Sequence, residues 1–263
     1  MNALSNYLED AFLNHLLLGI SAYSPTTLEF SLHTENPGET GSVGEVSGGS
    51  YARAVVTNNT TNFPECSSTG VPSKTNGTAI TFPTATDAWG TITHWAVWDD
   101  DGDMLAYGEL SVPNIIASGK TPNFAAGAIS ISATNGSDGG LSYFAIRKLL
   151  DHVIGGTTYT PPSAIYTGLA TEVSGQTLTE WDDASYTRQE TEFDSPSSGV
   201  CLNTNSETFS ASVAVSATLT AWGIWDDVSV GNRLAFGTLE TSRTPAIADS
   251  VTAASGAIKV TLK

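Results

Sequence analysis

The sequence has few basic residues, few cysteines and no long apolar run, and these shortages exclude several classes of function. Its 263 residues include 10 Lys and Arg against 27 Asp and Glu, so the formal net charge is −17. Such a chain repels phosphate backbones and anionic lipid surfaces, and we expect no nucleic-acid partner and no membrane partner. No apolar stretch reaches the roughly 18 residues that a membrane-spanning helix needs. Glu9 and Asp10 also stand where a signal peptide is apolar or basic, so we expect no exported form.

The motifs of common enzymes are absent as well. The sequence holds no GxSxG, no P-loop, no HExxH and no GxGxxG after a predicted strand. Its four histidines, His15, His33, His94 and His152, have no metal-ligand spacing among them. We therefore expect a protein that is not an enzyme and that carries no cofactor.

What the sequence does contain is an internal repeat. WAVWDD at 95–100 returns as WGIWDD at 222–227, and LAYGEL at 105–110 returns as LAFGTL at 234–239. Nearer the start of each copy, Leu4-Ser5, His15, Gly19 and Pro25 match residues 137 positions further on. The repeat predicts two tandem domains, 1–133 and 141–263, joined by a flexible linker at 134–140 with the sequence TNGSDGG.

Each copy opens with a predicted amphipathic helix and continues with short strands. Leu4, Leu8, Phe12 and Leu16 recur every four residues, and Leu141, Ala145, Leu149 and Val153 do the same, so one face of each helix should pack on its domain. Short β-prone runs separated by Gly, Pro, Asn and Ser fill the rest. The fold class is therefore mainly β: two tandem antiparallel β-sandwich domains, jelly-roll-like, each preceded by a short helix.

The two cysteines do not belong to this repeat. Cys66 and Cys201 are 135 residues apart, whereas the Gly-Val pairs at 70–71 and 199–200 align at 129. The two cysteines are thus not equivalent, and we expect no disulfide framework.

Asp99, Asp101 and Asp103 form the one candidate metal site. Carboxylates at alternate positions beside Gly102 are typical of a calcium loop, but the distal Glu of that pattern is missing and the second copy lacks the cluster. An acidic turn between two strands explains the same residues, and we favour it.

Trp98 and Trp225 are the candidate interaction residues. Residues three apart on a strand point to opposite faces, so only one Trp of each WxxW pair is expected in the core. The second ring then lies at an interface or at a strand end, or it serves as a platform for a sugar. We favour a structural role, with WxxWDD marking a central strand that runs into an acidic turn.

Two longer phrases carry a family resemblance. TENPGETGSVGEVSGGSYAR at 34–53 and AITFPTATDAWGTITHWAVWD at 79–99 resemble recurring phrases of small virion proteins from tailed phages and prophages, often labelled tail-fibre-like or structural. The second copy keeps only Ser185–Arg188 of the first phrase and has FSASVAVSAT in place of the FPTAT segment. The resemblance implies a non-enzymatic virion protein and brings no catalytic residues with it.

The sequence leaves the position in the virion open between two interpretations. We expect a decoration or cement protein on the capsid exterior, because two linked domains can bridge neighbouring copies of the major capsid protein. The alternative is a tail-fibre or baseplate component, structural or glycan-binding, whose partners are tail proteins. In both cases we expect a homo-oligomer on the outside of the particle, assembled in the cytoplasm of the bacterial host.

Overall fold

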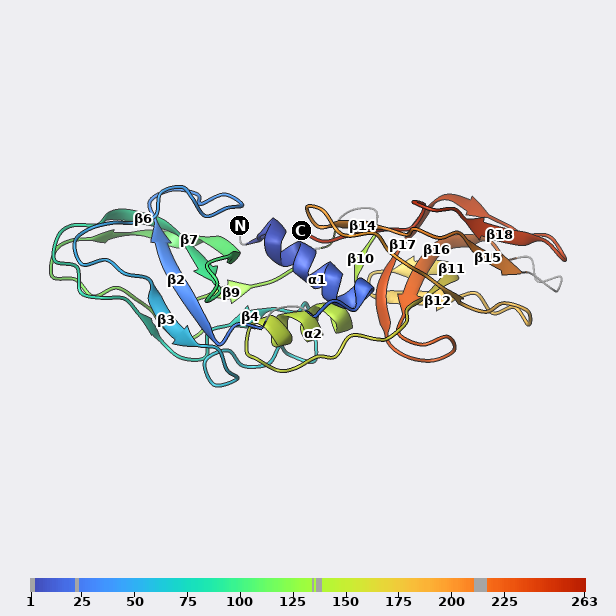
Figure 1. Cartoon of the computed structure of the whole chain (residues 1–263), viewed down its shortest axis with the longest axis horizontal. Coiled ribbons are helices and arrows are strands. Elements are labelled where there is room, and N and C mark those ends of the chain that lie inside the picture. The colour runs from blue at the N-terminus through green and yellow to red at the C-terminus, as the bar shows by residue number, and fades with distance from the viewer. Residues whose placement is uncertain (1–2, 22–23, 134, 136–138, 211–216) are drawn as a thin grey trace.

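The computed structural model describes residues 3–21, 24–133, 135, 139–210 and 217–263. The molecule is elongated, with one β-rich half at each end and two helices between them (Figure 1). Both chain ends lie near the middle of the long axis (Figure 1). We call residues 3–133 the first half and residues 139–263 the second half.

The main sheet of the first half has five antiparallel strands in the order β1-β7-β6-β2-β3. Their bounds are Ala3–Leu4 for β1, Thr27–His33 for β2, Ala54–Thr57 for β3, Gly90–Trp98 for β6 and Met104–Ile116 for β7. The strand predicted from WAVWDD is thus the central strand β6, and its acidic residues begin the turn into β7.

The main sheet of the second half has the order β10-β17-β16-β11-β12, in which β10, β17, β16 and β11 match β1, β7, β6 and β2, and β13, which also pairs with β11, matches β3. The bounds are Gly140–Leu141 for β10, Tyr166–Ser174 for β11, Thr177–Glu180 for β12, Gln189–Glu190 for β13, Leu219–Trp225 for β16 and Arg233–Arg243 for β17. WGIWDD therefore occupies the same place in β16 that WAVWDD occupies in β6.

Two short antiparallel ribbons complete each half. In the first half they are β4 (Lys74–Thr75) with β9 (Ser130–Ile131), and β5 (Ile80–Thr81) with β8 (Asn123–Phe124). In the second half they are β14 (Val200–Leu202) with β19 (Lys259–Thr261), and β15 (Glu207–Ser210) with β18 (Ser250–Ala253). In the first half, Ile80 of β5 and Ile131 of β9 lie in the same apolar core as Phe30 and Trp95 of the main sheet. The two ribbons therefore cover one face of that sheet.

The helices begin at equivalent serines. Helix α1 spans Asn6–Leu18, and the Ser5 side chain caps it by accepting the N–H of Leu8. Helix α2 spans Tyr143–Val153, and Ser142 caps it in the same way through the N–H of Ala145. A serine at this position satisfies a backbone donor that the first turn leaves unpaired. Among the described residues, no helix is both long and apolar enough to cross a membrane.

Each helix lies between its own half and the other one. Helix α1 contacts β7 of the first half and β14 of the second, and the two helices contact each other. His15 of α1 and His152 of α2 stack with ring centroids 4.7 Å apart. One continuous cluster of buried apolar residues includes Phe12, Trp95, Leu149 and Trp222, so a single core runs from one half into the other.

A buried ion pair links the halves beside this core. Lys74 of β4 donates to the Asp151 carboxylate of α2 at 2.6 Å, and the Lys74 side chain is 0% exposed. The same carboxylate oxygen accepts the backbone N–H of Cys66 at 2.8 Å. On the opposite side, the Asp10 carboxylate of α1 accepts the backbone N–H of Gly199 in the second half at 2.8 Å.

The predicted fold class is confirmed: the chain is mainly β, with two antiparallel sheet systems that are each preceded by a short helix. The division at residues 133 and 141 stays a prediction. Residues 134 and 136–138 of the expected linker lie outside the described residues, as does 211–216 of the FSASVAVSAT segment. Each helix packs on its own half as expected, but its other face meets the opposite half.

Candidate functional site

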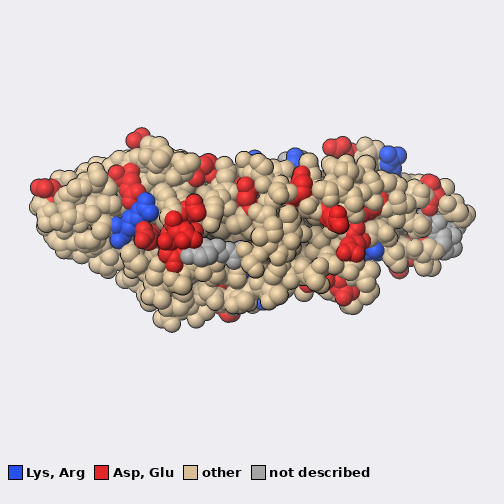
Figure 2. Space-filling view, viewed as in Figure 1, with Lys and Arg blue, Asp and Glu red and all other residues tan. Residues whose placement is uncertain are grey.

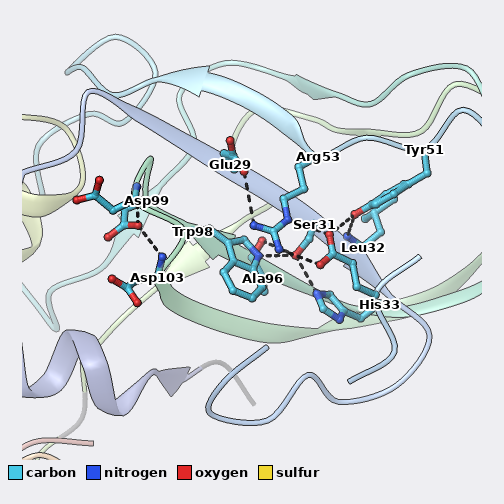
Figure 3. A network of polar contacts seen from close by, with 12 residues as sticks. Glu29, Ser31, Leu32, His33, Tyr51, Arg53, Ala96, Trp98, Asp99 and Asp103 are labelled. Carbon is cyan, nitrogen blue, oxygen red and sulfur yellow. Dashed lines mark hydrogen bonds and ion pairs between the residues drawn. The ribbon is translucent and has the colours of Figure 1, made fainter. Parts of the chain in front are cut away.

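Figure 3 shows a polar network around Arg53 at the edge of the first sheet. The Arg53 guanidinium donates twice to the Glu45 carboxylate, at 2.9 Å from both Nε and Nη2, and forms a longer ion pair of 3.5 Å with Glu29. It also lies over the Trp98 ring, 3.8 Å from the centroid. The Tyr51 hydroxyl donates to Glu45 at 3.2 Å. Arg53 thus joins a loop carboxylate to the last aromatic ring of β6.

Burial and hydrogen bonding act in opposite directions on the Glu45 carboxylate. Burial alone would raise the pKa of Glu45, but the hydrogen bonds and charge of Arg53 outweigh it and hold that pKa below its ordinary value. Glu45 therefore stays ionised, as the two-pronged contact with a guanidinium requires.

A chain of hydrogen bonds begins at the indole N–H of Trp98. Its Nε1–H donates to Ser31 Oγ at 2.8 Å, and Ser31 lies 2.8 Å from Nε2 of His33. His33 Nδ1 lies 2.8 Å from the carbonyl oxygen of Val43, which can only accept. The neutral ring with the proton on Nδ1 satisfies every member of this chain. Burial lowers the pKa of His33, in agreement with a neutral ring.

The second half repeats the contacts of the arginine with its glutamate, tyrosine and tryptophan, but not the chain through Ser31 and His33, because Gly168 and Ala170 stand at those positions. Arg188 donates to both oxygens of Glu180 at 2.8 and 2.7 Å, and it lies 4.0 Å from the centroid of the Trp225 ring. Tyr186 donates to Glu180 at 2.8 Å and accepts the backbone N–H of Leu169 at 2.9 Å. In the first half Tyr51 makes both contacts in the same way, with Glu45 and with the N–H of Leu32.

The two networks differ in how the tryptophan is seated. Two glycines lie beneath Trp225, and a Cβ added at Gly168 or Gly223 would come within 3 Å of its ring. The first half has side chains at the matching positions, Ser31 and Ala96. Arg188 also donates to a backbone carbonyl of the turn after β16, that of Asp227, at 2.7 Å. Its side chain is accordingly more buried than that of Arg53, with 7% exposed against 25%.

Trp98 and Trp225 are where the sequence analysis placed them, at the ends of β6 and β16, but they are not open platforms. Each is only 6% exposed, and an arginine covers one face of each ring. The expectation that only one Trp of each pair is buried was wrong, because Trp95 and Trp222 are buried too. In each half, a loop and an arginine cover the sheet face on which this tryptophan lies. Trp98 and Trp225 therefore offer no free ring face to a sugar.

Asp99, Asp101 and Asp103 do not converge on a common point. Oδ1 of Asp99 accepts the backbone N–H groups of Asp101 and Asp103, at 3.1 and 2.7 Å. Within the described residues, no group of three or more His, Cys, Asp or Glu side chains is arranged to hold a metal ion. Asp226 binds the backbone N–H of Asn232 in the matching turn, so both aspartates shape turns.

Cys66 and Cys201 are free thiols that lie in different halves. Burial raises the pKa of the Cys66 thiol to about 12, and Asp151 adds to the shift. Burial raises the pKa of Cys201 as well. Neither thiol is activated as a nucleophile, since the reactive form is the thiolate.

Sequence reasoning missed the arginines of the networks and the pair formed by Lys74 and Asp151. The signal for the arginines was present, because Tyr51-Ala52-Arg53 and Tyr186-Thr187-Arg188 match each other in the repeat. No local pattern marks Lys74, which is usually a surface residue type. The networks hold loops and strands together, and their polar groups bind one another, which suits a structural role.

Two buried carboxyls lead to a prediction about pH. Burial raises the pKa of Glu9 to about 7, with Glu39 and Asp10 adding to the shift, and burial raises the pKa of Glu207 to about 7. Both groups therefore favour the folded state at low pH, and this contribution is lost progressively as the pH rises from about 4.5, the ordinary pKa of the carboxyl, to about 7. We expect Glu9→Gln and Glu207→Gln each to raise the free energy of unfolding at pH 8.5 by about 1–3 kcal/mol.

Urea denaturation at pH 5 and pH 8.5 checks this expectation. At pH 5 the difference between each variant and the parent protein should fall below about 1 kcal/mol, because the carboxyl is then protonated in the folded state and only partly protonated in the unfolded state. Glu240→Gln, at an exposed position of β17, is the control and should change neither value. Equal effects of Glu207→Gln at the two pH values would contradict the assignment.

Comparison with known families gives a match in each half of the chain. The model of a family described as Podophage GP4 fiber I protein gp80 matches residues 3–132 and again residues 140–261. No curated protein matches the chain significantly. Each matched segment contains one helix, one main sheet and one arginine–tryptophan network.

Proposed function

The chain belongs to the family described as Podophage GP4 fiber I protein gp80 and is a phage fibre structural protein, and from this premise we propose that its two repeats form one stiff segment of a tail fibre. The double family match carries the proposal. The continuous core across both halves supports stiffness, since a well-packed interior deforms little under load.

The family description favours the tail-fibre alternative of the sequence analysis over its main interpretation, a capsid decoration protein. We propose that the partners are other virion proteins of the tail and further copies of this chain, on the outside of the particle. The role is structural, so no catalytic turnover is expected.

The surface charge fits an external position. Acidic side chains are spread along the face shown in Figure 2, and basic side chains are few and scattered among them. With a net charge of −17, the chain stays soluble and avoids nonspecific adhesion to anionic surfaces. Host recognition through glycans receives less support, because the candidate rings Trp98 and Trp225 are covered by arginines.

Immunogold labelling of purified particles tests the position. We expect label on the tail fibres and none over the capsid shell. Quantitative mass spectrometry of the same particles should give a molar ratio to the major capsid protein far below unity. Label spread evenly over the shell, with a ratio near unity, would instead restore the decoration interpretation.

A further inference from the structure

The second half contains a groove of about 670 Å³ at its junction with helix α1. Its walls are the end of α1 and the residues after it, the segment that leads into β11, and the residues that follow Gln189 of β13. The lining residues are Leu17–Ile20, Pro161–Ile165 and Glu190–Phe193. We refer to this feature as the groove.

The equivalent place in the first half is closed by Asn58. Its side-chain amide donates to the carbonyls of Pro25 and Val153, both at 2.8 Å, and accepts the N–H of Gly155 at 2.6 Å. Its backbone N–H donates to the carbonyl of Thr26 at 2.9 Å. One residue thus ties together the three segments that correspond to the three walls of the groove.

In the second half the same chain position is Phe193, which pairs elsewhere. Phe193 bridges to Asn203. Strand β13 pairs with β11 over two residues only, whereas β3 pairs with β2 over four. The residues after β13 therefore separate from the segment before β11. The groove lies at this separation, whereas Asn58 fills the equivalent place in the first half.

The groove combines an apolar floor with an acidic wall. Leu17, Ile165 and Phe193 line the groove and are 6%, 4% and 8% exposed, while Glu190 and Glu192 beside them are exposed. Two exposed carboxylates beside apolar surface favour an occupant that carries an apolar side chain next to a cation.

The far end of the first half has this chemistry. We call residues 115–120, which are the end of β7 and the turn that follows it, the tip. It carries Ile115, whose side chain is 65% exposed, and exposed Lys120, whose Nζ donates to the carbonyl of Ile115 at 3.3 Å. It contains no carboxylate. At the matching positions of the second half, residues 244–249, stand Thr244 and Asp249.

We propose that the groove receives the tip of a second copy of this chain, with Ile115 on the apolar floor and Lys120 against Glu190 and Glu192. The tip and the groove lie on different halves of an elongated molecule (Figure 1). A contact between unlike surfaces adds copies head to tail, and unless the rotation closes a ring it produces a filament. The inference deepens the proposed fibre role and rests on it for the expectation that copies meet in the particle.

Charge reversal on the purified full-length chain tests the pairing, with sedimentation equilibrium over a range of concentrations as the measurement. We expect the parent chain to associate, and we expect association to weaken in 1 M salt. Lys120→Glu should reduce the average mass toward that of a single chain, and so should the double variant Glu190→Lys/Glu192→Lys. An equimolar mixture of the two variants should associate again, because each tip then faces a groove of opposite charge.

Variants at other charged residues serve as controls. Lys148→Glu and Glu240→Lys, at exposed positions outside both surfaces, should leave association unchanged. A parent chain that stays monomeric, or a mixture that does not associate, would overturn the proposal. The proposal would also be overturned if Arg243→Glu weakened self-association and Lys120→Glu did not, because the contact would then lie at the other end of the molecule. Groove variants that self-associate normally but fail to enter particles would show that the groove binds a different protein. The immunogold result tests the fibre position independently of this outcome.

Discussion

Replacing Lys74 by Met should lower the free energy of unfolding by about 3–5 kcal/mol, since it leaves the Asp151 carboxylate buried without its cation. The Nζ of Lys74 lies 2.6 Å from that carboxylate, and its side chain is 0% exposed. Removing one partner of a buried ion pair costs more than the pair itself contributes, because the remaining charge keeps its desolvation penalty. Chemical denaturation followed by tryptophan fluorescence measures the loss.

The double variant Lys74→Met/Asp151→Leu separates this cause from a packing defect. It removes both charges, so it should recover most of the lost stability. Lys148→Met on the exposed side of α2 is the matched control and should change stability by less than about 0.5 kcal/mol. A double variant as unstable as Lys74→Met would show that shape, and not charge, explains the loss.

Arg188→Ala is expected to have the second large effect, a loss of about 3 kcal/mol, because it leaves Glu180 without its guanidinium and uncovers the Trp225 ring. Arg53→Ala should cost only about 1–2 kcal/mol, since water screens its more exposed contacts with Glu45. Urea denaturation of the two variants gives the comparison.

Lysine at the same two positions tests whether geometry matters as well as charge. Lys has no planar fork for the two carboxylate oxygens, so Arg188→Lys should restore little of the loss. Equal losses for Arg53→Ala and Arg188→Ala would contradict the role given to burial.

The repeated strand and the helices were predictable from local patterns. WxxWDD combines β-forming residues with a turn signal, and the four-residue spacing from Leu8 to Leu16 marks a buried helix face. Periodicity shows that a face is buried but not what covers it. The contact of α1 with β14, and the stacking of His15 on His152, depend on the arrangement of the two halves, which no short pattern encodes.

The site was harder to predict than the fold for the same reason. Arg53 and Trp98 are 45 residues apart in sequence, and only the pairing of β2 with both β3 and β6 brings them together. The burial of Trp98 was missed because alternation along a strand predicts which side a residue faces, not whether a loop covers that side. Arg53 and the loop that carries Glu45 supply the cover.

The ion pair between Lys74 and Asp151 also constrains how this protein can evolve. Lys74 belongs to the first repeat and Asp151 to the second. A second contact also joins the repeats, because the N–H of Gly199 in the second repeat donates to Asp10 in the first. At these contacts, a change in one repeat therefore affects the other. A recombination event that replaced one repeat with its counterpart from a distant relative would separate both pairs at once, so successful exchange is expected to carry the two repeats together as one inherited block.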